Sequence, residues 1–461
     1  MERRPNMKKK LVVLAVLCIS VWALASCGAK KEEVDIIPST SPSLTDSVAA
    51  PPTNEPAVIP ATPTEIPATP TPEATSTPEP TPTAVPRIVQ GYDIGPATSG
   101  TALKDGFEKY FKIGTALNGS ALSNGTLRSE AMTEITKYHF NTVTYSNMMK
   151  SCYLLNQNES IKNAAAGNPE PAVSFDSVIE GLEFCKENGI GMRGHTLVWH
   201  TQVPDWFFRE GYTNDGAYVD RDTMLMRMES YIRQVLTFTQ ENYPGVIYCW
   251  DVVNEAIEIA KGSYETESGY KIRTQSGDGR NLWYDVVGWD YWEKAFEYAR
   301  KYAAPDVKLF YNDYNTFMWE KTDAICKLAS HLKERGLIDG IGMQGYMDLS
   351  FPSIYGSGSF ASALDRFGKL GLEVQLTELS ISCPDNSPES YEQQAKRYRS
   401  VFAALKANDI EHGGSVNITA VTFFGLMDQY MFYEGNTDYA RLFDKDLQPK
   451  PAFYSIMDFA E

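Results

Sequence analysis

The chain has 461 residues, of which 43% are hydrophobic, and carries a formal net charge of −17. This acidic balance argues against nucleic acid as a partner and against a basic membrane-binding face, because both require positive charge. The length exceeds that of one ordinary domain, so part of the chain is expected to lie outside the folded core.

The first 26 residues have the features of a bacterial lipoprotein signal peptide. Three lysines, at positions 8–10, precede an apolar run over residues 11–25 that is too short for a membrane span. The run ends Leu24-Ala25-Ser26-Cys27, which resembles a lipobox. We therefore expect lipidation of Cys27, membrane attachment and display on the extracellular face of the cell membrane. The alternative is an ordinary cleaved signal peptide followed by a chance cysteine, and Met7 is as plausible a start as Met1.

Residues 27–86 are rich in Pro, Thr, Ala, Ser and Glu, with few residues that a core could bury. Such composition predicts a disordered linker. Dense proline favours polyproline II, which rises about 3.1 Å per residue, so the linker could hold a domain on the order of 100 Å from the membrane.

Residues 87–461 alternate short apolar runs with helical patterns, which predicts one α/β domain. Eight strands followed by helices predict a (β/α)8 TIM barrel. An open doubly wound sheet is the alternative, but the first strand lacks a following Gly-rich phosphate loop. Ser387 and Pro388 form a helix start signal. The expected strands are 111–116, 141–145, 191–198, 246–253, 308–313, 340–345, 373–379 and 420–426, and the expected helices include 222–242, 291–302, 321–335 and 388–407.

Two of the expected strands end in a carboxylate. The run 246–253 leads into Asn254-Glu255, and the run 373–379 contains Glu378. A side-chain period of two predicts that Asp251 and Glu255 share one face, as do Leu376 and Glu378. Two carboxylates at the ends of buried strands can perform acid/base and nucleophilic chemistry on a glycosidic bond. The alternative is that each glutamate faces solvent in a loop.

Other polar and aromatic residues fall at the same ends of the expected strands. In a TIM barrel this end carries the active site. The clustering therefore favours a site rather than a scatter of solvent-facing residues. The residues are Asn147, Lys150, His195, Trp199, Asn254, Asn312, Asp313, Asn315, Gln344 and Tyr346.

These motifs resemble glycoside hydrolase family 10, the endo-β-1,4-xylanases, over residues 106–456. The matching segments are 194–206 (Gly-His-Thr-Leu-Val-Trp-His onward), 250–255 (Trp-Asp-Val-Val-Asn-Glu), 312–315, 376–379 and 442–451.

The resemblance implies a retaining hydrolase with no cofactor or metal, whose partner is xylan or a related β-1,4-linked polysaccharide. We also expect a monomeric protein. The resemblance assigns Glu378 as nucleophile and Glu255 as acid/base, with the carboxyls about 5–5.5 Å apart and the higher pKa on Glu255. Asn254 would donate to the sugar 2-hydroxyl, and His195 and Trp199 would line the glycone subsites. Core histidines remain the alternative for His195 and His200. The remaining implied substrate-binding residues are Asn147, Lys150, Gln344, Tyr346, Phe424 and Phe432.

The chain departs from the family pattern around the glycone subsites. Ser146 replaces a sugar-binding glutamate, Tyr346 a histidine that bonds the nucleophile, and Phe424 and Phe432 two tryptophans. A phenol can still donate a hydrogen bond, but the phenylalanines lose the indole donor. Two alternatives therefore stay open: a retaining hydrolase of another β-1,4-linked glycan, and a glycan-binding surface lipoprotein with little turnover.

Two further features concern the insertion after the fourth strand and the cysteines. Aromatic residues at 264, 270, 283 and 284 either extend the aglycone cleft or belong to the core. Of the seven cysteines, those outside positions 18 and 27 show no disulfide framework or zinc spacing.

Overall fold

The computed structural model describes residues 85–117, 125–260, 262–275, 279–428 and 439–460. The chain divides after Thr83, and residues Ala84–Glu461 form one compact unit. The expected signal peptide, Cys27, nearly all of the expected linker and Phe432 lie outside the described residues and stay predictions. Within the described part, every helix is too short or too polar to cross a bilayer.

Parallel strands close into a barrel, which confirms the predicted fold. Their order around the sheet is β12-β11-β8-β7-β4-β3-β15-β14, and pairing of β12 with β14 closes the ring. The short β13 (Tyr346–Met347) extends this sheet beside β14. The barrel strands are β3 (Lys112–Leu117), β4 (Thr142–Tyr145), β7 (Gly191–Trp199), β8 (Ile247–Asn254), β11 (Lys308–Asp313), β12 (Gly340–Met343), β14 (Glu373–Ile381) and β15 (Asn417–Phe423).

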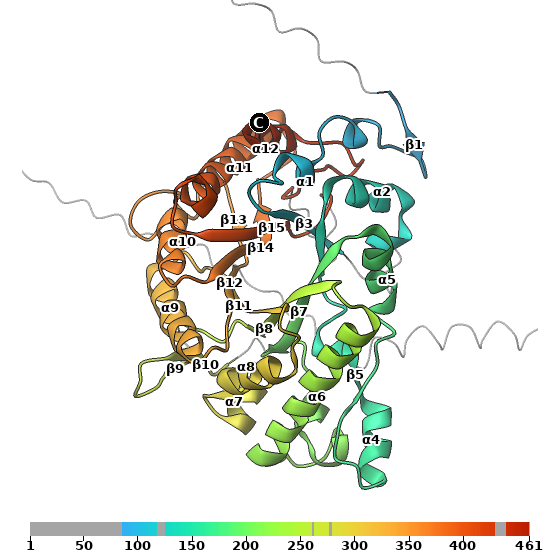
Figure 1. The fold of residues 1–461 in the computed structure, drawn as a ribbon, viewed down its shortest axis with the longest axis vertical. Coiled ribbons are helices and arrows are strands. Elements are labelled where there is room, and N and C mark those ends of the chain that lie inside the picture. The colour runs from blue at the N-terminus through green and yellow to red at the C-terminus, as the bar shows by residue number, and fades with distance from the viewer. Residues whose placement is uncertain (1–84, 118–124, 261, 276–278, 429–438, 461) are drawn as a thin grey trace, which may run out of the picture. The chain divides into compact units, whose positions relative to one another are not determined.

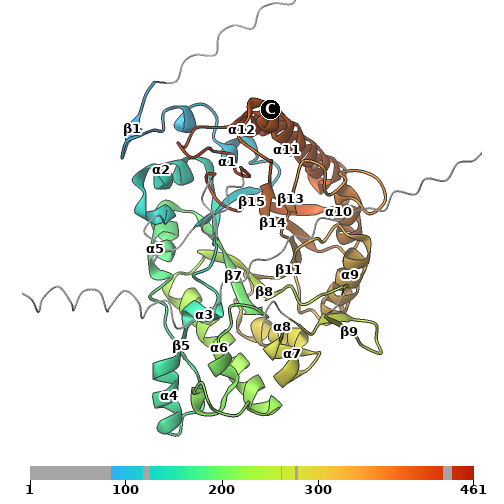
Figure 2. The same ribbon diagram turned by 180° about the vertical axis from the view of Figure 1, so that it is seen from behind.

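Helices surround the barrel, as Figure 1 and the reverse view in Figure 2 show. The four predicted helices are present, and the predicted cap at Ser387 is confirmed, because its hydroxyl accepts from the Ser390 amide at 3.2 Å. The longer helices are α2 (Glu130–His139), α4 (Gln157–Ala165), α5 (Ile179–Asn188), α6 (Arg221–Asn242), α8 (Tyr291–Tyr302), α9 (Trp319–Glu334), α10 (Phe360–Gly368), α11 (Pro388–Asn408) and α12 (Pro451–Ala460).

Shorter elements fill the connections between strands and helices. Three antiparallel pairs, β1 with β2, β5 with β6 and β9 with β10, stand apart from the barrel sheet. These elements are β1 (Ile88–Val89), β2 (Tyr92–Asp93), α1 (Leu103–Gly106), α3 (Ser151–Leu154), β5 (Leu155–Asn156), β6 (Ala172–Val173), β9 (Ser263–Glu265), β10 (Lys271–Arg273) and α7 (Leu282–Val287).

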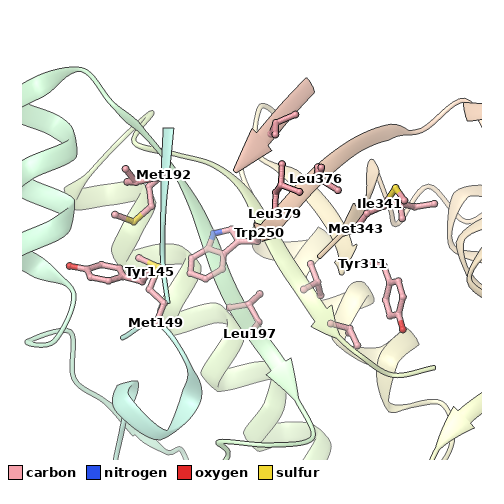
Figure 3. Packing of buried hydrophobic residues seen from close by; sticks show 14 of the residues in the cluster. Tyr145, Met149, Met192, Leu197, Trp250, Tyr311, Ile341, Met343, Leu376 and Leu379 are labelled. Carbon is pink, nitrogen blue, oxygen red and sulfur yellow. The ribbon is translucent and has the colours of Figure 1, made fainter. Parts of the chain in front are cut away.

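The apolar core contains Trp250 of β8, which is 1% exposed. Figure 3 shows its indole among the side chains of the neighbouring strands, with Met192 and Leu197 of β7 nearby. Gly194 of β7 faces this ring, and a Cβ at that position would lie 2.3 Å from it. Close contact of β7 with β8 therefore requires glycine at residue 194.

The barrel interior, in contrast, holds a buried polar cluster. Arg193 of β7 forms an ion pair with Asp251 of β8, and both side chains are at most 1% exposed. The Arg193 Nε also donates to Gln375 Oε1 of β14 at 2.8 Å. Since β7 and β14 are not neighbours in the sheet, this bond crosses the interior and links opposite walls.

Strict alternation fails at the carboxyl ends of β8 and β14, which corrects the predicted faces. Glu255 lies just beyond β8 with a φ of 57°, and it shares the site with Asn254, its immediate neighbour. In β14, Thr377 and Glu378 both contact Asn312, and the register shifts between Leu376 and Leu379. Leu376 belongs instead to the apolar cluster. Local irregularities therefore place both glutamates.

Candidate active site

The site lies where the barrel strands end, as predicted, and Glu255 follows β8 there. Its positive φ of 57° is uncommon for a residue other than glycine and stores backbone strain. Two hydrogen bonds hold this conformation: the Glu255 amide donates to Asn312 O at 2.9 Å, and Arg273 Nε donates to Glu255 O at 2.9 Å. The main chain of Glu255 is therefore fixed on both sides.

The Glu255 carboxylate accepts three hydrogen bonds. Trp199 Nε1 donates to Oε2 at 3.0 Å, while Gln344 Nε2 and Asn254 Nδ2 donate to Oε1 at 2.8 and 3.2 Å. Trp199 belongs to β7, Gln344 to the loop that follows β12, and Asn254 to β8. Three separate parts of the barrel therefore set the direction of the carboxylate. The residue as a whole is only partly buried.

The Glu378 carboxylate is more deeply buried, with the residue 6% exposed. Tyr346 Oη donates to Oε2 at 2.7 Å, and Asn312 Nδ2 donates to Oε1 at 3.0 Å. Thr377 Oγ1 donates to Asn312 Oδ1 at 2.7 Å, which fixes the orientation of that amide. The hydrogen bonds from Tyr346 and Asn312 therefore fix the orientation of the Glu378 carboxylate.

Asn312 joins the two carboxylates into one network. Its Nδ2 donates to Asn254 Oδ1 at 2.9 Å as well as to Glu378, and Asn254 donates in turn to Glu255. Asn312 is among the polar residues expected at strand ends, but its sequence context does not assign it a role in the site. Its place in the segment 312–315 was the available signal.

The pKa values of Glu255 and Glu378 are shifted in the directions opposite to those expected from the sequence. Burial raises the pKa of Glu378, and the charge of Glu255 adds to this effect, against the hydrogen bond from Tyr346. Burial also acts to raise the pKa of Glu255, but His200, Gln344, Arg273 and Trp199 together lower it. The prediction that Glu255 has the higher pKa is therefore wrong for the free protein.

Lys150, Asn147 and Trp199 form a cluster next to the glutamates. Lys150 Nζ donates to Asn147 Oδ1 at 2.8 Å and lies 4.6 Å from the centre of the Trp199 ring. Burial lowers the pKa of Lys150 to about 8, although Glu378 and Glu255 act in the opposite direction. The cluster brings a cation and an indole face together beside the carboxylates.

His195 is tied to the interior ion pair rather than packed among apolar groups. Its Nδ1 lies 2.8 Å from Asp251 Oδ2, the same carboxylate that pairs with Arg193. His195 also lowers the pKa of Glu378 through its charge. The ring is thus oriented by Asp251, which the sequence analysis had placed on this face but not assigned a role.

Among the replaced family positions that the structure describes, Tyr346 contacts Glu378, and Phe424 packs against Tyr346. Tyr346 is 40% exposed, and its ring centre lies 6.1 Å from that of Phe424 in an edge-to-face arrangement. Phe424 and Ser146 are 3% and 1% exposed. A buried serine and an aromatic pair therefore stand where the resemblance implied a carboxylate, a histidine and an indole.

The aromatic residues of the insertion divide between core and surface. Trp283 is fully buried, and its Nε1 donates to Trp199 O at 3.0 Å, so it supports the indole of the site from behind. Tyr270 is buried against Trp292. Tyr264 is 42% exposed. The core alternative is therefore correct for Trp283 and Tyr270.

Among the described residues, no three or more His, Cys, Asp or Glu side chains are grouped so that they could hold a metal ion. The cysteines of this part, Cys152, Cys185, Cys249, Cys326 and Cys383, are free thiols.

The closed parallel barrel is that of a TIM-barrel enzyme, and the two carboxylates at the carboxyl ends of its strands are the groups that glycoside hydrolysis requires. The chain belongs to glycosyl hydrolase family 10, whose model matches residues 102–459.

Similar proteins carry xylanase names. A putative endo-1,4-beta-xylanase of Caldicellulosiruptor saccharolyticus is 47% identical over 315 residues, covering 67% of this chain and 96% of that protein. Endo-1,4-beta-xylanase B of Butyrivibrio fibrisolvens is 40% identical over 362 residues, covering 78% of this chain but 53% of that protein. The chain thus spans about half of the latter relative.

A solved structure supports the same comparison. The N-terminal endo-1,4-beta-D-xylanase 10B of Clostridium thermocellum, solved with xylohexaose, matches with a TM-score of 0.69 at 34% identity, covering 79% of this chain and 68% of that one.

Proposed function

We propose that the protein is a retaining endo-1,4-β-xylanase in which Glu378 is the nucleophile and Glu255 the acid/base residue. The observation that carries the proposal is the pair of carboxylates joined through Asn254 and Asn312 in a family 10 barrel. Retaining glycosidases need such a pair close together.

In the first step, Glu378 attacks the anomeric carbon and forms a covalent glycosyl-enzyme, while Glu255 gives a proton to the leaving oxygen. Asn312 and Tyr346 direct the attacking carboxylate through their hydrogen bonds at 3.0 and 2.7 Å. In the second step, Glu255 removes a proton from water, which attacks the same carbon and releases the sugar with retained configuration.

Bound substrate has to reverse the order of the pKa values within this pair. In the free protein the pKa of Glu378 is raised by burial, while that of Glu255 is lowered mainly by His200 and Gln344 against burial. The first step needs the reverse: an ionised Glu378 and a protonated Glu255. A sugar hydroxyl that donates to Glu378 and a sugar ring that excludes water from Glu255 both act in that direction.

A hydrolase of another β-1,4-linked glycan is the second candidate. The residues that depart from the family pattern, Ser146, Tyr346 and Phe424, favour it. Ser146 is buried at 1% exposure, and Tyr346 and Phe424 supply an aromatic wall. Loss of a carboxylate contact to sugar weakens xylan binding by about 1–3 kcal/mol. A glycan-binding lipoprotein with little turnover has the same support from these positions but leaves the hydrogen-bonded pair of glutamates unexplained.

The test is product analysis of residues Ala84–Glu461 on xylan and on other β-1,4-linked oligosaccharides. We expect short xylo-oligosaccharides whose newly released ends have the β configuration by NMR, with Glu378→Ala inactive. A higher kcat/KM on another glycan would assign the second candidate. Binding without product release would contradict an enzymatic function.

The proposal includes the location of the enzyme and its state of association. We propose that lipid on Cys27 anchors a monomeric enzyme at the extracellular face of the membrane, with the Pro/Thr-rich residues 27–86 as a spacer. The sequence Leu24-Ala25-Ser26-Cys27 after an apolar run supports this placement.

A further inference from the structure

The hairpin of β9 and β10 follows Glu255 along the chain and then returns to it. Arg273 N donates to Ala256 O at 2.8 Å, and Glu258 N donates to Lys271 O at 3.2 Å. Ile272 and Ile257 form an antiparallel bridge between these bonds. Strand β10 therefore pairs with the segment that comes directly after Glu255.

The Arg273 side chain, on β10, is 8% exposed and makes contacts in three directions. Its Nε donates to Glu255 O at 2.9 Å, and its Nη2 donates to Tyr314 Oη at 2.7 Å. Its Nη1 lies 2.9 Å from Glu258 Oε2. A planar guanidinium can serve three such partners at once, whereas a lysine ammonium on a flexible chain cannot reproduce the fork.

The backbone conformation of Glu255 depends on hydrogen bonds such as the one from Arg273. Its φ of 57° is held by Asn312 O on the amide side and by Arg273 Nε on the carbonyl side. The carboxylate receives its hydrogen bonds from Trp199, Asn254 and Gln344. Arg273 therefore contacts the main chain that carries the carboxylate.

The main chain of Arg273 is itself anchored. Asn281 Nδ2 donates to Arg273 O at 2.8 Å, and Asn281 is fully buried and caps α7. The support of Glu255 thus runs from α7 through β10 to the residue after β8.

We propose that Arg273 is a positioning residue that holds Glu255 in the geometry for proton transfer to the leaving group. This inference rests on the proposed role of Glu255 in glycoside hydrolysis. It predicts a defect that depends on how much the leaving group needs a proton, because Arg273 acts only through the acid/base residue.

The charges around Glu255 fit this role. Burial favours the neutral form of Arg273, but Tyr314, Glu255 and Glu258 raise its pKa, so the guanidinium stays charged. Its charge in turn helps to lower the pKa of Glu255, after His200 and Gln344 and against burial. The other titratable groups that interact with Glu255 are Lys150, Asp313, Tyr291, Tyr346 and Glu378.

The experiment compares two aryl β-xylobiosides with the same sugar. Phenol is a poor leaving group that needs protonation, whereas 2,4-dinitrophenol leaves without it. We expect Arg273→Gln to lower kcat/KM for the phenyl glycoside about 10- to 100-fold, as for a misplaced catalytic group. For the dinitrophenyl glycoside, kcat/KM should stay near the wild-type value, because the first step needs no proton from Glu255. Its kcat and KM should both fall, because Glu255 also acts as the base in the second step, which then becomes slower and lets the glycosyl-enzyme accumulate.

Two variants complete the comparison. Arg273→Lys keeps the charge but loses the fork, so we expect the same dependence on the leaving group. If Arg273→Gln does not fold, Arg273→Lys replaces it in the comparison of the two glycosides. Lys271→Gln removes a cation from the same strand and should leave both substrates unaffected. In a Glu255→Ala background, Arg273→Gln should add no further loss for the phenyl glycoside.

The titration of Glu255, followed by carboxyl NMR, gives a readout without substrate. Removal of the Arg273 charge should raise the pKa of Glu255, and Arg273→Lys should raise it less. Equal losses on both glycosides, or an unchanged titration with unchanged rates, would overturn the positioning role. A wild-type protein inactive on both glycosides would refute the proposed function instead, and the titration would then decide the role of Arg273.

Discussion

At the scale of single residues, the site uses neutral donors to set two carboxylates. Tyr346 and Asn312 direct Glu378, while Gln344 and Trp199 direct Glu255. Hydrogen bonds to the charged form of an acid favour ionisation, so each donor affects acidity as well as direction. Tyr346 is informative because a phenol keeps its proton over the pH range in which the glutamates titrate.

We expect Tyr346→Phe to shift the alkaline limb of the kcat/KM profile to higher pH, because in the free protein Glu378 has the higher pKa of the two glutamates and that limb follows it. The hydrogen bond from Tyr346 lowers the pKa of Glu378, so its loss raises that pKa. The reactive form has Glu378 ionised and Glu255 protonated, so a further rise in the pKa of Glu378 makes this form rarer at the pH optimum and moves the alkaline limb upward. Loss of a bond to a charged group should also lower kcat/KM about 10- to 100-fold.

A pH–rate profile of each variant checks this prediction, and the two limbs belong to the coupled pair. Tyr355→Phe is the matched control, because Tyr355 is 60% exposed. An alkaline limb that stays in place or moves to lower pH would contradict the role of Tyr346.

At the scale of elements, apolar side chains such as Trp250 pack in the buried core, whereas the inside of the barrel contains a cluster of polar and charged side chains. The Arg193–Asp251 pair joins β7 to β8, and Gln375 extends the contact to β14. Two charges buried in this way are costly to separate, because each would remain without a partner in a low-dielectric interior. The same carboxylate orients His195, so the interior links stability to the site.

Asp251→Asn should lower the free energy of unfolding by about 3–5 kcal/mol, since it leaves Arg193 buried without an opposite charge. Chemical denaturation measures this difference. The matched control is Asp323→Asn, which breaks an ion pair with Arg366 whose aspartate side chain is 68% exposed. Exposed pairs contribute about 0–1 kcal/mol. Equal effects of the two substitutions would refute the importance of burial.

Gly194→Ala tests the contact between neighbouring strands. A Cβ at residue 194 would lie 2.3 Å from the Trp250 ring, so β7 and β8 must separate or the indole must move. Overpacking of this kind should cost about 1–3 kcal/mol of stability. The cost should fall in a Trp250→Leu background, where the ring is absent. An additive double variant would show that the glycine is not required for this contact.

At the scale of the whole molecule, the compact unit begins at Ala84 and contains the barrel and its site. Its core is closed on itself, because β12 pairs with β14 and leaves the barrel without a free edge. The proposed anchor at Cys27 concerns where the enzyme acts rather than how it acts.

We expect Cys27→Ser to move the protein from the membrane fraction to the soluble fraction without changing kcat/KM on soluble xylo-oligosaccharides. Buried acyl chains supply the membrane affinity, at about 0.8 kcal/mol per methylene. Cell fractionation with activity measurements on both fractions tests this. A Cys27→Ser protein that stays with the membrane would contradict lipidation at Cys27.

The sequence alone was enough to predict the barrel, because each strand is a short apolar run and each predicted helix has its own period or cap. It also led us to propose Glu255 and Glu378 as the catalytic pair, since a carboxylate at the end of a buried strand is unusual. The resemblance of segments such as 250–255 to a known family added their roles. These features are local and can be read along the chain.

Tertiary structure decided the remainder, because it depends on contacts between distant segments. The left-handed conformation of Glu255 and the shift in β14 broke the alternation expected from sequence. The acidities of the two glutamates depend on burial and on His200 and Gln344, which lie far apart in the chain. Arg273 reaches Glu255 across 18 positions of sequence only because β10 folds back onto the segment after β8. No local pattern records such a contact, and its chemistry follows from the fold.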